Sequence, residues 1–263
     1  MSYLFDNLDA IAGISSRSPF GLIPDIYGTI SAIAPSPSQA VVHPGCRAQL
    51  SRLAGRLALV AAVSGRPVAE AKEMVGIDGM VYIGNHGLER WRDGVTEYAG
   101  GVEAYRAQLA SLRDELAGSL SLAGLQIEDK GVSLSIHYRN CPDRQRASES
   151  ILNRIGASNK AKPFYIVEGK MVVELRPPVE ADKGSAVKGL IRDYALRGGL
   201  YMGDDASDID AFRVMHGEGF AAVGVLGEES RDEVAREADC TLNGVSDVAR
   251  FLEWLAGAVG NAE

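Results

Sequence analysis

Four aspartates fall within seven positions of the segment 203–212, which reads Gly-Asp-Asp-Ala-Ser-Asp-Ile-Asp-Ala-Phe. No lysine or arginine interrupts them, so their carboxylates repel one another at neutral pH. Asp204 and Asp205 follow a short apolar run, where a buried strand would end. Asp208 and Asp210 fall in the first turns of a following helix, where the helix dipole favours negative charge. The cluster therefore suits either a solvated helix cap or a hard divalent cation with oxygen ligands.

A second acidic segment, Asp25-Ile26-Tyr27-Gly28-Thr29, also follows an apolar run. A carboxylate such as that of Asp25 can attack phosphorus and form an aspartyl phosphate, provided that a metal offsets the repulsion between two anions. Gly28 would let the backbone approach the phosphoryl group, and Thr29 could donate a hydrogen bond to it. A plain polar turn is the alternative interpretation of these five residues.

Two further segments bring a hydroxyl and a cation to the ends of predicted elements. Ser64-Gly65 follows the run 57–63, and a hydroxyl with free backbone N–H groups at a helix start forms an anion site. Ser64 as an ordinary helix N-cap is equally compatible with the sequence. Lys183 opens a predicted helix and could neutralise a bound phosphoryl group, although a lone lysine is usually a solvated one.

The apolar runs that recur along the chain predict the fold. Short buried strands that alternate with amphipathic helices are typical of an α/β fold with a Rossmann-like parallel sheet. Ligands of such sheets bind outside the carboxyl ends of the strands, so the loops there carry the chemistry. The predicted strands are 21–23, 57–63, 80–83, 200–202 and 220–225.

The middle third of the chain has a different pattern. In order, it predicts a helix at 102–119, strands at 125–128 and 132–138, a helix at 143–156, and strands at 164–167 and 171–175. This αββαββ order suggests an antiparallel sheet with helices on one face, inserted as an α+β domain into the parallel one. We therefore expect the first part of the core at 1–99, the inserted domain at 100–178 and the second part of the core at 179–263.

Charge and cysteine content narrow the choice of partners. The net charge of -8 over 263 residues argues against nucleic acid and anionic membranes as partners. Cys46, Cys141 and Cys240 are far apart and odd in number, which fits a reducing cytoplasm. No apolar run approaches about 18 residues. We expect a soluble, cytoplasmic protein, a monomer or weak dimer, that acts on a small molecule; the missing Gly-rich nucleotide loop argues against a kinase or ATPase.

The four chemical segments, in this order along the chain, resemble the haloacid dehalogenase (HAD) superfamily of phosphotransferases and, within it, the trehalose-6-phosphate phosphatases. The resemblance covers nearly the whole chain from about Pro24 onward. It includes the stretches 83–89, 127–131, 136–139 and 170–177. It implies a Mg²⁺-dependent phosphoric monoester hydrolase that converts trehalose 6-phosphate to trehalose and phosphate through an aspartyl phosphate. It also implies that the inserted domain is a cap of the C2B type that closes over a disaccharide.

The resemblance implies roles for particular residues of the core. Asp25 would be the nucleophile, and its carboxyl would share one Mg²⁺ ion with Asp204 and with the backbone carbonyl of Tyr27. Asp205 would belong to the same metal group, and Asp208 would support it from behind. The phosphoryl group would be held by Thr29, Ser64, Gly65 and Lys183.

The resemblance also implies contacts to the sugar. In the inserted domain these come from Glu128, Lys130 and Glu174, with help from Arg139. Paired carboxylates and a lysine suit this task because each accepts or donates several directed hydrogen bonds. Surface salt bridges across the hairpins are the alternative for these residues. His86 would line the site or, equally, pack as a histidine at the seam between the domains.

One position departs from the family pattern. Family members normally carry an aspartate two residues after the nucleophile, where this chain has Tyr27. That carboxyl protonates the leaving sugar and then activates water, whereas a tyrosine with a reference pKa near 10 is a poor base. Because general acid–base catalysis contributes about 10²–10⁴ in rate, we expect slow turnover. The alternatives are an impaired pseudo-phosphatase that binds a sugar phosphate, and a phosphatase for another glycosyl phosphate.

Overall fold

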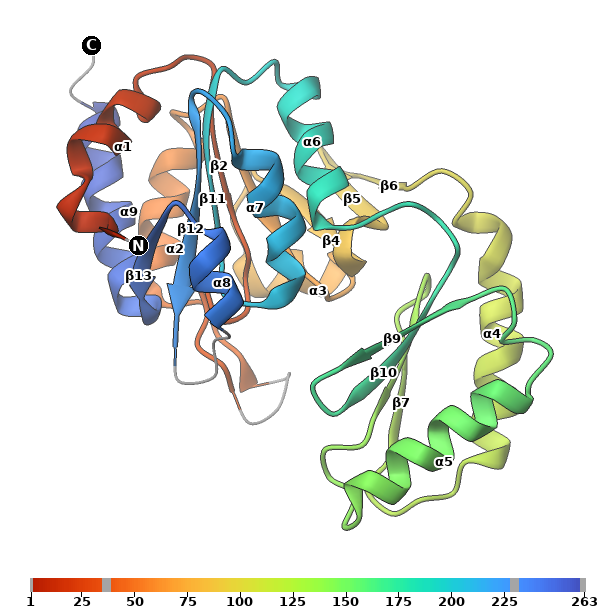
Figure 1. Ribbon diagram of the computed structural model, residues 1–263. Helices are drawn as coiled ribbons and strands as arrows, with labels where there is room; N and C mark the ends of the chain where they lie inside the picture. Colours follow the sequence, from red (N-terminus) through yellow and green to blue (C-terminus); the bar gives the residue numbers. More distant parts are fainter. Residues whose placement is uncertain (1, 35–38, 228–231, 261–263) are drawn as a thin grey trace. The chain divides into compact units, whose positions relative to one another are not determined.

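The computed structural model describes residues 2–34, 39–227 and 232–260, and the chain divides into two compact units. The first unit comprises residues 1–97 and 181–263, and the second comprises residues 98–180 (Figure 1). The segment that departs from the βα pattern of the sequence thus forms a unit of its own. Each unit has its own sheet and its own hydrophobic core.

The first unit is built on a sheet with the strand order β1-β13-β12-β11-β2-β3-β4-β5-β6. From β1 to β4 all neighbouring strands pair in parallel. The five apolar runs of the sequence are strands of this parallel part: β2 (Phe20–Pro24), β3 (Leu59–Val63), β4 (Val81–Gly84), β11 (Gly198–Gly203) and β12 (Phe220–Leu226). The predicted Rossmann-like parallel sheet is confirmed.

Helices cover both faces of this sheet, which explains why the strands are continuously apolar. On one face, α1 (Leu8–Ser15), α2 (Pro44–Ala54), α3 (Val68–Val75) and α9 (Gly244–Gly260) share a core with Leu22 of β2. On the other, α6 (Lys183–Asp193), α7 (Ile209–Met215) and α8 (Asp232–Glu237) pack around the next residue, Ile23. Successive residues of a strand thus enter different cores.

Strands at the two edges of the sheet lie outside the predicted set. β5 (Glu89–Arg92) pairs antiparallel with β4, and β6 (Val95–Tyr98) follows it. The two are joined by Asp93 and Gly94, both with positive φ, as a two-residue hairpin turn requires. At the other edge β1 (Ser2–Tyr3) pairs with β13 (Cys240–Asn243), and the 3₁₀ turn η1 (Leu4–Asp6) and α1 follow β1. The N-terminal segment is therefore part of the first unit.

The second unit has an antiparallel sheet with the order β7-β8-β10-β9. Its strands are β7 (Gln126–Asp129), β8 (Leu134–His137), β9 (Tyr165–Gly169) and β10 (Val172–Arg176). α4 (Glu103–Ser119) and α5 (Arg144–Ala157) share one apolar core with one face of this sheet, as the sequence predicts. Polar side chains occupy the other face. No helix in the described part of the chain has the length and hydropathy of a membrane span.

Candidate active site

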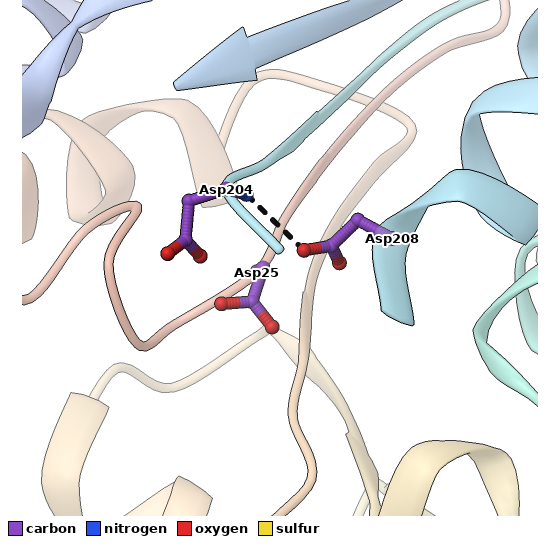
Figure 2. Close-up of side chains that lie close together, drawn as sticks. All are labelled: Asp25, Asp204 and Asp208. Carbon is purple, nitrogen blue, oxygen red and sulfur yellow. Dashed lines mark hydrogen bonds between the residues drawn. The ribbon is translucent and has the colours of Figure 1, made fainter. Parts of the chain in front are cut away.

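The carboxyl ends of β2 and β11 bring two acidic segments together. These strands pair in parallel with Met202 opposite Pro24, so Asp25 and the loop after Gly203 leave the same edge of the sheet. One carboxylate oxygen each of Asp25, Asp204 and Asp208 lies within 4.8 Å of the others (Figure 2). Two segments about 180 residues apart in the chain therefore form one acidic group.

Of the three carboxylates in this group, that of Asp208 accepts the most hydrogen bonds. It lies in the 3₁₀ turn η4 (Ala206–Asp208) and is fully buried. Its Oδ1 accepts hydrogen bonds from Lys183 Nζ at 2.7 Å and from the Tyr201 hydroxyl at 2.6 Å. Its Oδ2 accepts from the backbone N–H groups of Asp204 and Asp205 at 3.1 and 3.0 Å. Four donors occupy both oxygens, so Asp208 anchors the loop that carries Asp204.

Lys183 is the cation of the group. It is the first residue of α6, where Asp182 caps the helix by accepting from the Ser185 N–H at 2.6 Å. Its Nζ also donates to Asp25 Oδ1 at 2.6 Å, and the side chain is buried. Burial lowers the pKa of Lys183, but the neighbouring carboxylates outweigh it and raise the pKa overall. The lysine therefore stays protonated next to Asp25.

The negative charges of the Asp25 and Asp204 carboxylates are poorly compensated by neighbouring cations and hydrogen-bond donors. Burial raises the pKa of Asp25 to about 7, with Lys183 opposing and Asp208 adding to the shift. Burial, followed by the charges of Asp25 and Asp208, raises the pKa of Asp204 to about 9. Within the described residues neither Asp25 Oδ2 nor the Asp204 carboxyl has a hydrogen-bond donor. These two carboxylates are therefore the ones available to a cation.

The donor set fits a hard divalent metal. Mg²⁺ prefers carboxylate oxygens at about 2.0–2.1 Å, so oxygens on opposite sides of the ion are about 4 Å apart. Because one oxygen of each of the three carboxylates lies within 4.8 Å of the others, a single ion could be shared among them. Asp205, expected in the metal group, is not one of the three; it is the N-cap residue of η4.

Thr29 and Gly28 shape the loop after Asp25. Thr29 is fully buried, and its hydroxyl has no hydrogen-bond partner among the described residues. Because such a group costs about 1–3 kcal/mol, a bound ligand is the natural partner. Gly28 has a φ of +88°, and a Cβ at this position would overlap the Asp204 carboxylate. Only glycine lets the two acidic segments approach this closely.

Ser64 lies beside Asp25, because Asp25 forms a β-bridge with Val63. Its side chain is buried, and its Oγ accepts from the Arg66 N–H at 3.2 Å. The alternative that Ser64 caps a helix is wrong. The next helix, α3, begins at Val68 with Pro67 as its N-cap, so residues 65–67 separate Ser64 from it.

His86 lies against Gly65, which together with Ser64 is the predicted anion site. A Cβ on Gly65 would lie 2.5 Å from His86 Nε2, so the imidazole occupies the space that a side chain would need. Asn85 and His86 lie in the 3₁₀ turn η3 (Asn85–Gly87) with φ of +48° and +55°, a conformation that costs non-glycine residues energy. Their N–H groups donate to the carbonyls of Arg66 and Ser64 at 2.7 and 3.0 Å, which fixes the imidazole there.

The Tyr27 side chain contacts Ala34 and Arg66. Its hydroxyl is 2.9 Å from both the backbone nitrogen and the backbone oxygen of Ala34, donating to the oxygen and accepting from the N–H. The Arg66 guanidinium lies over its ring, 5.4 Å from the centroid. The hydroxyl is thus engaged by the backbone.

The polar face of the second unit carries two of the expected carboxylates. Glu174 is buried, and its Oε1 accepts from Lys130 at 3.3 Å and from the hydroxyls of Ser133 and Ser135 at 3.2 and 3.5 Å. Its Oε2 accepts from the Arg176 guanidinium at 2.7 and 2.5 Å. This cluster joins β8, β10 and the turn after β7.

Glu128 forms a separate pair with His137. The distance between Glu128 Oε2 and His137 Nε2 is 2.7 Å. This hydrogen bond lowers the pKa of Glu128 despite the opposing effect of burial. Arg139 is exposed, and its backbone oxygen accepts from Arg144. The structure thus gathers Glu128, Lys130 and Glu174 on one sheet and leaves the Arg139 side chain outside the cluster.

Several contributors were missed in the sequence. Tyr201 lies inside an apolar run, so the sequence pattern indicates only a buried strand residue. Nothing in that pattern indicates that its hydroxyl takes part in the site. Ser133, Ser135 and His137 alternate along the predicted strand 132–138, and a period of two puts them on one face. Arg176 follows Glu174 at the same spacing. The alternation was therefore a usable signal for the polar face.

Comparison with known proteins decides the family. The sequence model described as trehalose-phosphatase matches residues 23–243. The chain belongs to the trehalose-phosphatase family. A trehalose-phosphate phosphatase of Mycolicibacterium paratuberculosis is 31% identical over 278 residues, covering 100% of this chain and 69% of the relative. As a member of the trehalose-phosphatase family, the chain is a phosphoric monoester hydrolase.

Solved structures support the fold. A crystal structure of a trehalose-6-phosphate phosphatase related protein superimposes with a TM-score of 0.78 at 21% identity, covering 92% of this chain and 100% of that one. A haloacid dehalogenase-like hydrolase from Bacteroides thetaiotaomicron gives a TM-score of 0.64 at 14% identity, covering 89% and 98%. These structures confirm the HAD-like fold class.

Proposed function

We propose that this trehalose-phosphatase family member hydrolyses trehalose 6-phosphate to trehalose and phosphate, with Asp25 as the nucleophile and Mg²⁺ as the metal. One observation carries the proposal. The buried Asp25 carboxylate is hydrogen-bonded to Lys183 and shares an acidic group with Asp204. The substrate is that of the relatives named trehalose-phosphate phosphatase.

In the first step an oxygen of the Asp25 carboxylate attacks phosphorus. The bond from phosphorus to the sugar oxygen breaks, and that oxygen takes up a proton as trehalose leaves. Lys183, Ser64, Thr29 and the backbone of Gly65 hold the phosphoryl oxygens, where fixed donors stabilise the charge that develops. The product is an aspartyl phosphate on residue 25.

In the second step water attacks the phosphorus of the aspartyl phosphate. The bond from phosphorus to the Asp25 oxygen breaks, and phosphate and the free carboxylate are regenerated. Tyr27 occupies the position from which proton transfer is expected, but its hydroxyl is bonded to Ala34. We therefore propose slow turnover, with the second step more affected because it needs a base.

The metal would be held by the carboxylates of Asp25 and Asp204 and by the backbone carbonyl of Tyr27, with Asp205 nearby. When bound, it supplies the positive charge that lets one anion attack another. The uncompensated charge of the acidic group supports this assignment. Asp208 would hold Asp204 in place through the backbone.

The second unit would be a cap of the C2B type that recognises the sugar. Glu128, Lys130 and Glu174 would bind hydroxyls, assisted by Arg139, and His86 of the first unit would also contact the substrate. The clustering of charged groups on one sheet face supports the first three. A cytoplasmic setting, supported by three free and buried cysteines, and a monomer or weak dimer complete the proposal.

Phosphate release tests the function. Trehalose 6-phosphate should yield phosphate with Mg²⁺, EDTA should abolish the release, and Asp25→Asn should be inactive although folded. A panel of other glycosyl phosphates at the same concentration gives the comparison. No release from trehalose 6-phosphate at high enzyme concentration, or faster release from another glycosyl phosphate, would contradict the proposed substrate.

A second candidate is a pseudo-phosphatase that binds a sugar phosphate with little turnover. The engaged hydroxyl of Tyr27 favours it, because no carboxylate replaces the missing acid–base group at this position. Calorimetry with trehalose 6-phosphate, run beside the phosphate assay, separates the two. Binding without measurable turnover would support the second candidate.

A further inference from the structure

The edge strand β9 of the second unit exposes two apolar side chains. Tyr165 is 61% exposed and Val167 is 38% exposed. Such exposure at the edge of a small sheet calls for a partner, because isolated edges of this kind invite association. The chemistry of that partner depends on the face of the sheet on which the two side chains lie.

The register places both side chains on the polar face. Tyr165 pairs with Arg176 and Val167 pairs with Glu174, and directly paired residues of antiparallel strands share a face. Glu174 in turn pairs with Ser135, which pairs with Glu128. One row of side chains therefore runs from Glu128 on β7 to Val167 on β9.

The residue between them lies on the opposite face. Ile166 is 46% exposed and pairs with Leu175, which is buried in the core beneath the helices. β9 therefore presents apolar groups of similar exposure to two different faces. The face with Tyr165 has hydrogen-bonding groups gathered beside it, whereas the face with Ile166 contributes to the apolar core beneath the helices.

This combination of groups suits a sugar. A pyranose has apolar C–H faces and a rim of hydroxyls, and binding sites pair apolar surface with a few directed polar groups. A tyrosine offers a rigid apolar ring with a polar end. The Lys130–Glu174–Arg176 cluster next to Tyr165 supplies the polar groups.

The width of the face indicates how many rings it can contact. β7 and β9 are separated by three strand spacings, about 14 Å in total. A single sugar ring is narrower than this and reaches only one edge of the face. A disaccharide can contact the charged groups near β7 and the ring of Tyr165 together.

We propose that Tyr165, flanked by Val167, packs against a sugar ring of the substrate and thereby favours a disaccharide phosphate over a monosaccharide phosphate. This inference rests on the proposed function and assigns a specificity role within it. No charge on Tyr165 is required, because the contact is made by the face of the ring.

The test compares Tyr165→Ala with Ile166→Ala, its neighbour on the opposite face. KM and kcat are measured for trehalose 6-phosphate and glucose 6-phosphate, and binding of both is measured by calorimetry without metal. Tyr165→Ala should weaken binding of trehalose 6-phosphate about 2- to 10-fold, the range of one aromatic contact. It should change binding of glucose 6-phosphate less than about twofold. Ile166→Ala should change neither, and Tyr165→Phe should restore most of the loss.

The outcomes separate this inference from the proposed function. Wild-type hydrolysis with equal behaviour of the two alanine variants overturns the inference and leaves the function standing. Loss of binding to the disaccharide phosphate in Tyr165→Ala, in a chain without turnover, supports the inference and counts against the function. Equal losses for both substrates overturn the inference, as does a change of oligomeric state in Tyr165→Ala with unchanged binding.

Discussion

Replacing Tyr201 by phenylalanine isolates one hydrogen bond of the acidic group. The Tyr201 hydroxyl donates to the buried Asp208 carboxylate at 2.6 Å, and its ring packs edge-on against Phe212. The phenylalanine keeps the ring and removes only the donor. A hydrogen bond to a charged group is worth about 1.5–3 kcal/mol, so unfolding should become easier by that amount. Over a unit of this size the melting temperature should fall by about 3–12 °C.

The chain offers a matched control in Tyr82. Its hydroxyl is equally buried, donates to the Ile77 carbonyl at 2.7 Å, and its ring packs edge-on against Trp91. The same hydroxyl accepts from the Ile77 N–H at 3.2 Å, so Tyr82→Phe removes two hydrogen bonds between neutral groups, each worth about 0.5–1.5 kcal/mol. Both variants should have a lower melting temperature than the wild-type chain, but only Tyr201→Phe removes a hydrogen bond to the acidic group.

The deciding assay is the Mg²⁺ dependence of phosphate release. Asp208 holds the backbone of Asp204, so a looser Asp208 should misplace that carboxylate. Losing a direct partner of a metal ligand typically costs about 10- to 100-fold in metal affinity or activity. Tyr201 acts through Asp208, one contact further from the proposed ligand Asp204, so a loss of about 10-fold, the low end of this range, is expected for Tyr201→Phe. Tyr82→Phe should keep the wild-type half-saturating Mg²⁺ concentration. If Tyr201→Phe keeps it too, Asp208 does not position the metal site and the reasoning fails.

Three further predictions concern the same site. Tyr27→Asp should raise turnover at least about tenfold, a threshold below the about 10²–10⁴ that a general acid–base group contributes; an unchanged kcat would show a deeper loss. Gly28→Ala should abolish Mg²⁺ activation because the new Cβ overlaps Asp204, whereas Gly13→Ala, in open space, should not; a Mg²⁺ titration of both variants checks this. Without metal, stability should fall as pH rises from about 4 through 7 and on to 9, because Asp25 and Asp204 have pKa values raised above the ordinary 3.8 and the folded state binds their protons more tightly. Mg²⁺ should accordingly raise the melting temperature more at pH 9 than at pH 6, and an equal rise at both would contradict the metal assignment.

The sequence predicted the strands that are buried on both faces of the parallel sheet. Strands such as β3 and β11 are short apolar runs because helices cover both faces, and that pattern is readable. The edge strands β5 and β6 were missed because they are charged and partly exposed. Their only local signal was the Asp93-Gly94 turn between them.

The sequence predicts those parts of the candidate site whose positions follow from the parallel strands alone. Asp25 and the 203–212 segment meet because parallel strands end at one edge of the sheet. The supporting role of Asp208 followed from the family resemblance, but its hydrogen-bond partners were not predictable, since they are a tyrosine hydroxyl inside an apolar run and two backbone N–H groups. The sequence left a helix cap at Ser64 open as an alternative, because only the structure shows that Pro67 is the N-cap and that α3 begins at Val68.

The magnitudes argue for a slow enzyme over a mere binding protein. Fixed charges and donors aimed at developing charge usually supply most of an enzyme's rate enhancement. In the proposed mechanism they would come from Lys183, Ser64 and Thr29, whose side chains are all buried. General acid–base catalysis adds about 10²–10⁴, and that part alone depends on Tyr27. Because the Tyr27 hydroxyl is held by Ala34 and its ring by Arg66, the substitution leaves the charged group around Asp25 intact. In the proposed mechanism the chain would therefore keep the larger contribution to the rate and lose the smaller one.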